Sequence, residues 1–242
     1  MTLPAERYRA AIRDEADALV DAAERAGRDA PVPPCPEWDV AGLLRHVGRV
    51  HRWAAANVEA NDFVPPHTLP ESPGPDELAQ WVRDGADALV AAVDRPSSDP
   101  AWTFVTPDGT VGFWQRRQAH ETAVHRVDAE LAAGAPRPVA GDLAADGIDE
   151  WLALLPFRPN ATLPSGRGET LHLHCTDRDG EWLIRLTEAA PEIERTHAKG
   201  DVAVRGPASD LLLVLLRRAD PHRVEVLGER GVLEGFLSHT AF

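Results

Sequence analysis

The hydrophobic periodicity changes once along this 242-residue chain, near residue 155, and this change constrains the fold more than any other feature. Before it, apolar residues recur three to four positions apart, as on one face of a helix. After it, Thr170–Thr176 and Glu181–Thr187 alternate with period two around the turn Arg178-Asp-Gly180, which is the pattern of a β-hairpin. We therefore expect an α+β protein of two domains, one helical and one mixed.

The expected first domain covers residues 1–155 and is a helical bundle. Asp39 is a natural N-cap for a helix, and Gly134 is a natural stop after one. Proline-rich segments separate the earlier helices, because proline interrupts both helix and sheet. The expected helices span residues 6–27, 40–60, 76–94, 112–133 and a shorter 142–154.

Residues 156–169 are rich in proline and glycine and are expected to be a linker. The expected second domain covers residues 170–242 and contains the hairpin, two more strands and two helices. Gly206-Pro207 marks the start of the first of these helices. The additional strands are expected at 201–205 and 223–227, and the helices at 208–218 and 230–239.

Charge and composition limit the classes of partner. The formal net charge is −14, whereas nucleic acids and anionic membrane surfaces attract basic proteins, so we expect neither as a partner. No apolar run approaches the roughly 18 residues of a membrane-spanning helix, and the first residues do not resemble a signal peptide. The only two cysteines, Cys35 and Cys175, lie far apart, which favours a reducing cytoplasm over a disulfide framework.

Three polar residues fall at positions that a helical bundle would bury. Glu121 and His125 are four residues apart and so share one helix face, next to apolar neighbours. His46 lies within the apolar stripe of the helix expected at 40–60. Buried imidazoles and carboxylates are costly unless they are paired or bind a cation, and bundles build metal sites from such facing side chains. The spacing therefore suggests a metal site, with a satisfied polar network as the alternative.

Neighbouring histidines are excluded as ligands by their position on the helix. His51 lies about 140° around the helix from His46, and His120 is separated from His125 in the same way. Asp128 lies about one turn beyond His125, where it would either accept a hydrogen bond from the second ring nitrogen or remain an exposed charge.

Three further positions carry groups that can bind metals or react. Cys35 is interpreted as a small buried hydrophobic residue rather than a group near the metal. His172 and His174 share one face of a strand, where packing or surface placement is favoured over a second metal site. Cys175 points to the opposite face and adds no ligand.

The segments Val32–Trp53 and Arg117–Glu130 resemble the mycothiol-dependent maleylpyruvate isomerase family, and Leu171–Trp182 and Val204–Leu213 resemble its second domain. This resemblance covers nearly the whole chain. It implies an N-terminal four-helix bundle similar to DinB proteins and a small α+β domain similar to sterol carrier proteins.

The resemblance further implies that His46, Glu121 and His125 hold a divalent metal, and that mycothiol is the thiol co-substrate. Two histidines and a glutamate suit Zn²⁺ best, although Ni²⁺, Fe²⁺ and Co²⁺ also bind such sets. Metal coordination lowers the pKa of a thiol, and the thiolate could then add to an activated double bond. In the family an arginine of the second domain is thought to contribute, and Arg205 and Arg218 lie in the corresponding region.

We therefore expect an isomerase or S-transferase that acts on a small electrophile with mycothiol. The alternative is a non-catalytic, metal-containing protein that binds a small molecule. We expect a monomer, because the second domain could close over the open end of the bundle. The sequence leaves the electrophile, the metal and any further catalytic residue unassigned.

Overall fold

A computed structural model describes residues 2–106, 108–157 and 164–239. It divides into two compact units, with residues 3–137 in one and the chain from Pro138 onward in the other. The first unit is all-helical and the second contains a five-stranded sheet with helices, so the predicted α+β class with two domains is confirmed.

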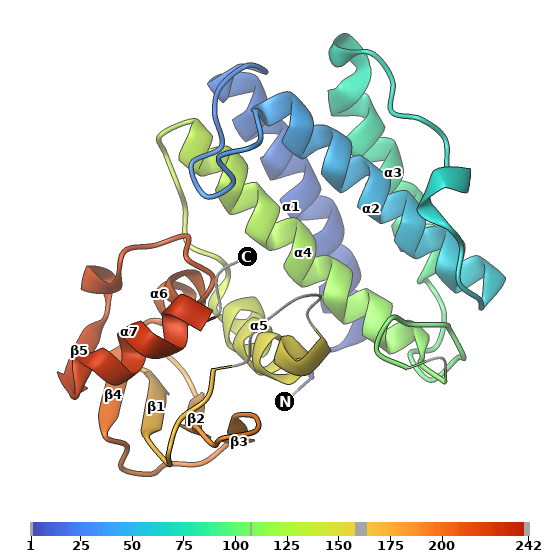
Figure 1. The fold of residues 1–242 in the computed structure, drawn as a ribbon. Coiled ribbons are helices and arrows are strands. Elements are labelled where there is room, and N and C mark those ends of the chain that lie inside the picture. The colour runs from blue at the N-terminus through green and yellow to red at the C-terminus, as the bar shows by residue number, and fades with distance from the viewer. Residues whose placement is uncertain (1, 107, 158–163, 240–242) are drawn as a thin grey trace. The chain divides into compact units, whose positions relative to one another are not determined.

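The first unit is the predicted four-helix bundle. Its helix α4 lies lengthwise against α1 and α2, and α3 packs on the other side of α1 and α2 (Figure 1). Asp39 caps α2 as expected, since its carboxylate accepts a hydrogen bond of 2.6 Å from the backbone of Gly42. The four helices are α1 (Ala5–Ala26), α2 (Val40–Ala60), α3 (Leu78–Ala92) and α4 (Val111–Ala132), and short 3₁₀ turns at Pro66–Thr68 and Pro75–Glu77 precede α3.

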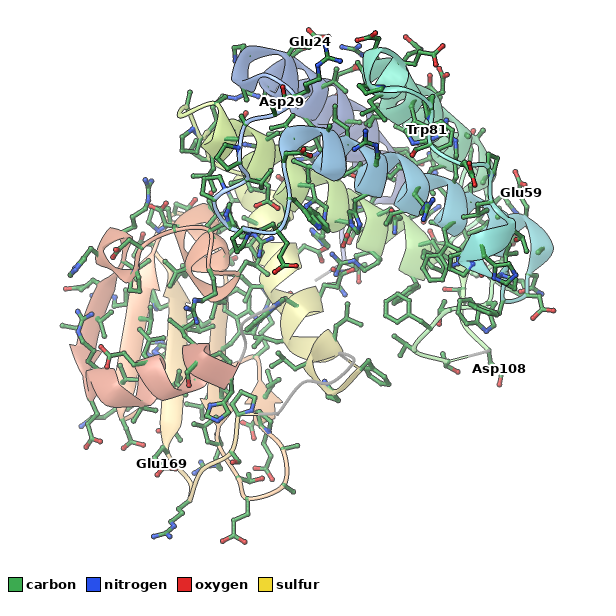
Figure 2. The ribbon with its side chains drawn as sticks, turned by 45° about the horizontal axis from the view of Figure 1, so that its top comes forward. Glu24, Asp29, Glu59, Trp81, Asp108 and Glu169 are labelled. Carbon is green, nitrogen blue, oxygen red and sulfur yellow. The ribbon has the colours of Figure 1, made fainter. Side chains whose placement is uncertain are left out.

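Helices α2 and α3 approach each other closely at Gly48, where a side chain would have no room. A Cβ atom there would lie 2.2 Å from the indole of Trp81, the α3 residue labelled in Figure 2. The guanidinium of Arg52 lies 3.4 Å from the centre of the same ring and donates hydrogen bonds to the carbonyls of Gly48 and Trp81. This contact fixes α2, and with it His46, against the rest of the bundle.

Helix α4 carries charged groups into the bundle and pairs them there. All 22 of its residues are buried or half-buried, including several charged ones. Arg126 donates to Glu15 of α1 at 2.6 Å and to Glu130 at 2.7 Å, and Glu130 also accepts from Arg137 at 2.6 Å. These bonds satisfy the buried charges, as burial requires, and they link the last turn of α4 to α1.

The second unit starts with α5 (Gly141–Leu154) and the short 3₁₀ helix Leu155–Phe157. Helix α5 packs against α6 (Ala208–Leu215), so this division of the chain falls earlier than the predicted boundary at 155. Of the expected linker 156–169, residues 158–163 lie outside the described part of the chain.

The sheet has the order β3-β2-β1-β4-β5, in which β1 is antiparallel to β2 and parallel to β4. Alternate residues of β1 and β4 point to one face and form an apolar layer, which includes Leu171, Leu173, Val202 and Val204. Helices α6 and α7 (Arg230–His239) contact β1 and β4 (Figure 1). The strands are β1 (Thr170–Cys175), β2 (Glu181–Arg185), β3 (Glu192–Glu194), β4 (Val202–Gly206) and β5 (Glu225–Gly228).

Three elements of this unit differ from the sequence-based expectation. Strand β3 was not predicted, since its three residues are all exposed and show no apolar alternation. Helix α6 ends at Leu215 rather than 218, because Arg217 takes a left-handed conformation with φ 62°. Strand β5 begins at Glu225 because Pro221–Arg223 form a 3₁₀ turn.

Many carboxylates lie on the surface of the bundle, in contrast to the buried Asp128 and Glu130 of α4. Exposed carboxylates such as Glu24, Asp29 and Glu59 project outward from the bundle (Figure 2). Within the described residues, no helix is both long enough and apolar enough to cross a membrane.

Candidate metal centre

The bundle brings His46, Glu121 and His125 together. The Nε2 atom of His125 lies 3.2 Å from Oε1 of Glu121, and the Nε2 atom of His46 lies 3.5 Å from the same oxygen. The two imidazole rings are 4.9 Å apart and nearly perpendicular. One potential ligand atom from each residue therefore lies within 4.8 Å of the others, with α2 supplying one group and α4 supplying two.

Asp128 orients the second of these imidazoles. It is fully buried, and its carboxylate lies 2.9 Å from Nδ1 of His125. Of the two alternatives for Asp128, the structure therefore supports the hydrogen bond with His125 and contradicts the exposed charge. An Nδ1–H that donates to Asp128 leaves Nε2 directed towards Glu121, which is how carboxylates commonly position metal-binding histidines.

The electrostatics of the trio follow from these contacts. Burial alone would raise the pKa of Glu121, but hydrogen bonds with His125 and His46 hold that pKa well below its usual value. Burial alone would lower the pKa of His125, but the carboxylates of Asp128 and Glu121 outweigh it and raise the pKa to about 9. The carboxylates of Asp128 and Glu121 therefore favour positive charge at His125.

Neighbouring side chains hold the trio in place. The indole of Trp38, just before α2, lies 4.7 Å from the ring of His46 and 6.0 Å from that of His125. Arg117, one turn before Glu121 on α4, donates to Oε2 of that carboxylate at 3.2 Å. Glu121 thus keeps Oε1 towards the imidazoles while Oε2 is occupied by the guanidinium.

The chemistry of these donors fits a divalent metal. Two imidazole nitrogens and one carboxylate oxygen form a donor set typical of catalytic zinc sites, which leave at least one coordination position for water or substrate. The side chains of His46 and Glu121 are 32% and 27% exposed, so solvent reaches the group.

The histidines that the sequence analysis set aside lie in the bundle interior. His51 is fully buried, and its Nε2 atom lies 2.9 Å from the hydroxyl of Thr122. That hydroxyl donates to the carbonyl of Gln118, so it accepts from His51, whose Nε2 carries the proton. His120 is buried edge-on to Tyr8. Cys35 is half-buried rather than buried as expected.

The two arginines of the second unit have local partners. Arg205 on β4 forms an ion pair of 3.1 Å with Glu225, its neighbour across the sheet on β5. Arg218 donates to the carbonyl of Leu216 just after α6. A role for either arginine in catalysis stays a prediction.

A second cluster formed by residues of the sheet was missed. His172 and His174, interpreted as packing or surface residues, lie beside Glu181 and His197, and one donor atom from each lies within 4.8 Å of the others. The hairpin pattern could have indicated part of it, since β-pairing sets Glu181 directly opposite His174. Nothing in the sequence pattern indicates His197, which lies on the loop after β3.

Models of one protein family match both units of the chain. The model of the mycothiol maleylpyruvate isomerase N-terminal domain matches residues 9–130, and that of the MDMPI C-terminal domain matches residues 142–235. No curated protein shows a significant match.

Among solved structures, a crystal structure of a mutant of mycothiol-dependent maleylpyruvate isomerase is similar in fold. Its TM-score is 0.66 at 16% sequence identity, and the similarity covers 95% of this chain and 97% of that one. The UbiJ-SCP2 ubiquinone synthesis protein gives a TM-score of only 0.31 at 18% identity, over 41% of this chain and 90% of that one.

Proposed function

The chain belongs to the mycothiol maleylpyruvate isomerase family, and from this premise we propose that it is a metal-dependent isomerase or S-transferase that uses mycothiol on a small electrophile. The observation that carries the proposal is the convergence of His46, Glu121 and His125 on α2 and α4, within the residues that the N-terminal family model matches. The proposal includes the predicted cofactor, a divalent metal, and the predicted co-substrate, mycothiol.

His46, Glu121 and His125 would hold the metal, and Zn²⁺ is the ion that this donor set suits best. A bound divalent metal lowers the pKa of a coordinated thiol, so that thiolate is available at neutral pH. Such a thiolate suits both reaction types. Addition to an activated double bond leaves a single bond that can rotate before the thiol is eliminated, which is isomerisation. Addition without elimination leaves mycothiol joined to the electrophile through its sulfur, which is S-transfer.

The protein's own groups would position and shield the reacting molecules. Asp128 keeps Nε2 of His125 directed towards Glu121, and Arg117 holds the other oxygen of that glutamate. The indole of Trp38 lies beside the two imidazoles and would form an apolar wall of the site. The exposed parts of His46 and Glu121 leave access from solvent for the thiol and its electrophile.

The first test is elemental analysis of protein purified without added metal, for the wild type and His125→Ala. We expect the wild type to hold about one equivalent of metal more than the variant, because His125→Ala removes one ligand of the bundle centre. The matched control is His67→Ala, which removes an exposed histidine of the same unit and should leave the bound metal unchanged. A wild type that stays metal-free after titration with zinc would reduce the trio to a hydrogen-bonded polar network.

Turnover is tested next, with mycothiol and a panel of electrophiles that starts with maleylpyruvate. Loss of free thiol indicates transfer, whereas isomerisation consumes no thiol and is followed by the absorbance of the substrate. Activity that requires both metal and mycothiol supports the proposal. A protein that binds metal but turns over no member of the panel would instead be the non-catalytic small-molecule-binding protein.

A further inference from the structure

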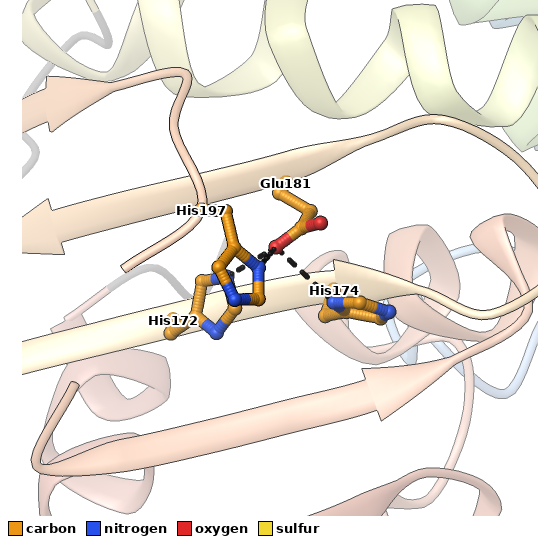
Figure 3. Close-up of side chains that lie close together, drawn as sticks. All are labelled: His172, His174, Glu181 and His197. Carbon is orange, nitrogen blue, oxygen red and sulfur yellow. Dashed lines mark hydrogen bonds and ion pairs between the residues drawn. The ribbon is translucent and has the colours of Figure 1, made fainter. Parts of the chain in front are cut away.

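The second unit gathers three imidazoles around one carboxylate oxygen (Figure 3). The Oε2 atom of Glu181 lies 2.9 Å from Nε2 of His172, 3.2 Å from Nδ1 of His174 and 2.5 Å from Nδ1 of His197. The three rings lie 5.5 to 6.3 Å apart and are steeply inclined to one another. Their nitrogens therefore reach the same point from three directions.

The fold builds this convergence from three segments. His172 and His174 point to the same face of β1, the face opposite the apolar layer, because side chains two apart in a strand share a side. Antiparallel pairing sets Glu181 of β2 directly across from His174. His197 comes from the loop after β3 and completes the group from above the sheet (Figure 3).

Gly200 allows that loop to lie close to the sheet. A Cβ atom at this position would lie 2.9 Å from the backbone nitrogen of His172 and 3.0 Å from the carbonyl of Thr170. Only a residue without a side chain can come this near to the backbone of β1. The loop therefore stays beside β1. His172, which faces the side of the sheet opposite the apolar layer, is buried.

Hydrogen bonds to Glu181 alone do not explain why three imidazoles meet at one carboxylate oxygen. A carboxylate oxygen offers two lone pairs, yet three ring nitrogens surround Oε2 of Glu181. A tetrahedral Zn²⁺ ion with bonds of about 2.0–2.1 Å places its ligand atoms roughly 3.3 Å apart. The four donor atoms already lie within 4.8 Å of one another, so side-chain adjustments on the order of 1 Å bring them to that spacing.

The surroundings are compatible with added positive charge. The nearest arginine in sequence, Arg195, is paired with Asp149 of α5 and lies near the indole of Trp182. Arg205, which β-pairing places beside His174, is paired with Glu225. An open pocket of about 510 Å³, whose lining includes Glu181 and His197, gives an ion access from solvent.

We propose that His172, His174, Glu181 and His197 form a second metal site, which binds a divalent transition metal, Zn²⁺ in preference, with four protein ligands. Imidazole and carboxylate are borderline to hard donors, which suits Zn²⁺ and excludes Ca²⁺ and Mg²⁺ as the preferred ion. Four protein ligands leave no position for a substrate, as in structural zinc sites. The ion would hold the loop after β3 against β1 and is independent of the centre in the bundle.

The test counts zinc in the full-length protein with the bundle site removed. Chelator-stripped His125→Ala protein is loaded with Zn²⁺, dialysed and analysed for bound metal. We expect one equivalent to remain, and to be lost when His174→Asn or His197→Asn is added. Both histidines are at least partly exposed, so these variants should fold. His222→Asn, which removes an exposed histidine of the same unit, is the matched control and should leave the equivalent bound.

A second readout reports the geometry. Co²⁺ bound in place of Zn²⁺ should show the strong visible absorption of a four-coordinate ion, and His197→Cys should retain the ion and shift that absorption, since thiolate is also a zinc ligand. Zinc that dialyses away, or that stays bound equally in His174→Asn and in the His222→Asn control, would overturn the proposal. Neither outcome depends on whether the bundle centre binds metal, because His125→Ala is present throughout.

Discussion

Replacing His51 with glutamine should make the stability of the bundle less sensitive to acid. His51 is fully buried between helices, and burial lowers its pKa from 6.5 to about 4. Its Nε2–H donates to Thr122, a bond that the amide of glutamine can also make. The variant therefore removes a titratable group while it keeps a donor in the same place.

The magnitude follows from the two pKa values. The unfolded chain binds a proton at His51 below pH 6.5, whereas the folded protein does so only near pH 4, so folding stability is lost as the pH falls through this range. At pH 5 the loss from this residue is about 2 kcal/mol relative to neutral pH, and below pH 4 it reaches about 3 kcal/mol. No loss from this source arises above pH 7.

The assay is urea unfolding of the metal-free wild type and His51→Gln at pH 7 and pH 5, followed by helical circular dichroism. The difference in unfolding free energy between the two proteins should change by about 2 kcal/mol between these pH values. His67→Gln, an exposed histidine of the same unit, should behave like the wild type. If the wild type and His51→Gln lose stability in parallel, His51 is not held neutral by burial and the reasoning fails.

Three further predictions concern other parts of the chain. Asp128→Asn should weaken zinc binding at the bundle centre by about 10- to 100-fold, because it removes the carboxylate that orients His125. The zinc affinity is measured by competition with a chelator, and an unchanged affinity would show that Asp128 does not support His125 as a ligand. Gly48→Ala should lower the unfolding free energy by about 1–3 kcal/mol, because its methyl group would overlap Trp81, and a variant of wild-type stability in urea would contradict that packing. In native protein at pH 8, a maleimide should label the half-buried Cys35 and spare Cys175, because burial raises the pKa of the Cys175 thiol to about 12. Mass spectrometry of the labelled peptides measures the modification of each cysteine, and equal labelling of the two would refute this prediction.

The sequence indicated that Glu121 and His125 share one face of α4, and the structure brings them together with His46, although metal binding by the three stays a prediction. Glu121 and His125 lie four apart on one helix, so their shared face follows from spacing alone. Spacing left Asp128 undecided, because it gives the direction of a side chain but not what covers it. Burial of Asp128 depends on how other helices pack against α4, and that packing is not encoded in the periodicity of one helix.

The second cluster was only partly predictable for a similar reason. Period two placed His172 and His174 on one face, and the register of the hairpin places Glu181 opposite His174. His197 carries no such pattern, since it lies in a loop whose path depends on the contact at Gly200. The partner of α5 was unpredictable as well, because an amphipathic helix shows which face it buries but not which helix covers that face.

The two clusters differ in the order in which folding can complete them. His46 and Glu121 are 75 residues apart, and Arg126, which ties α4 to α1, bonds to a carboxylate 111 residues away. His172 and Glu181 are only 9 residues apart, across one hairpin. Closing a long loop costs more entropy and proceeds more slowly than closing a short one. An ion in the bundle would thus be acquired by a chain that has already folded, whereas most of the ligands on the sheet are assembled as soon as its first hairpin closes.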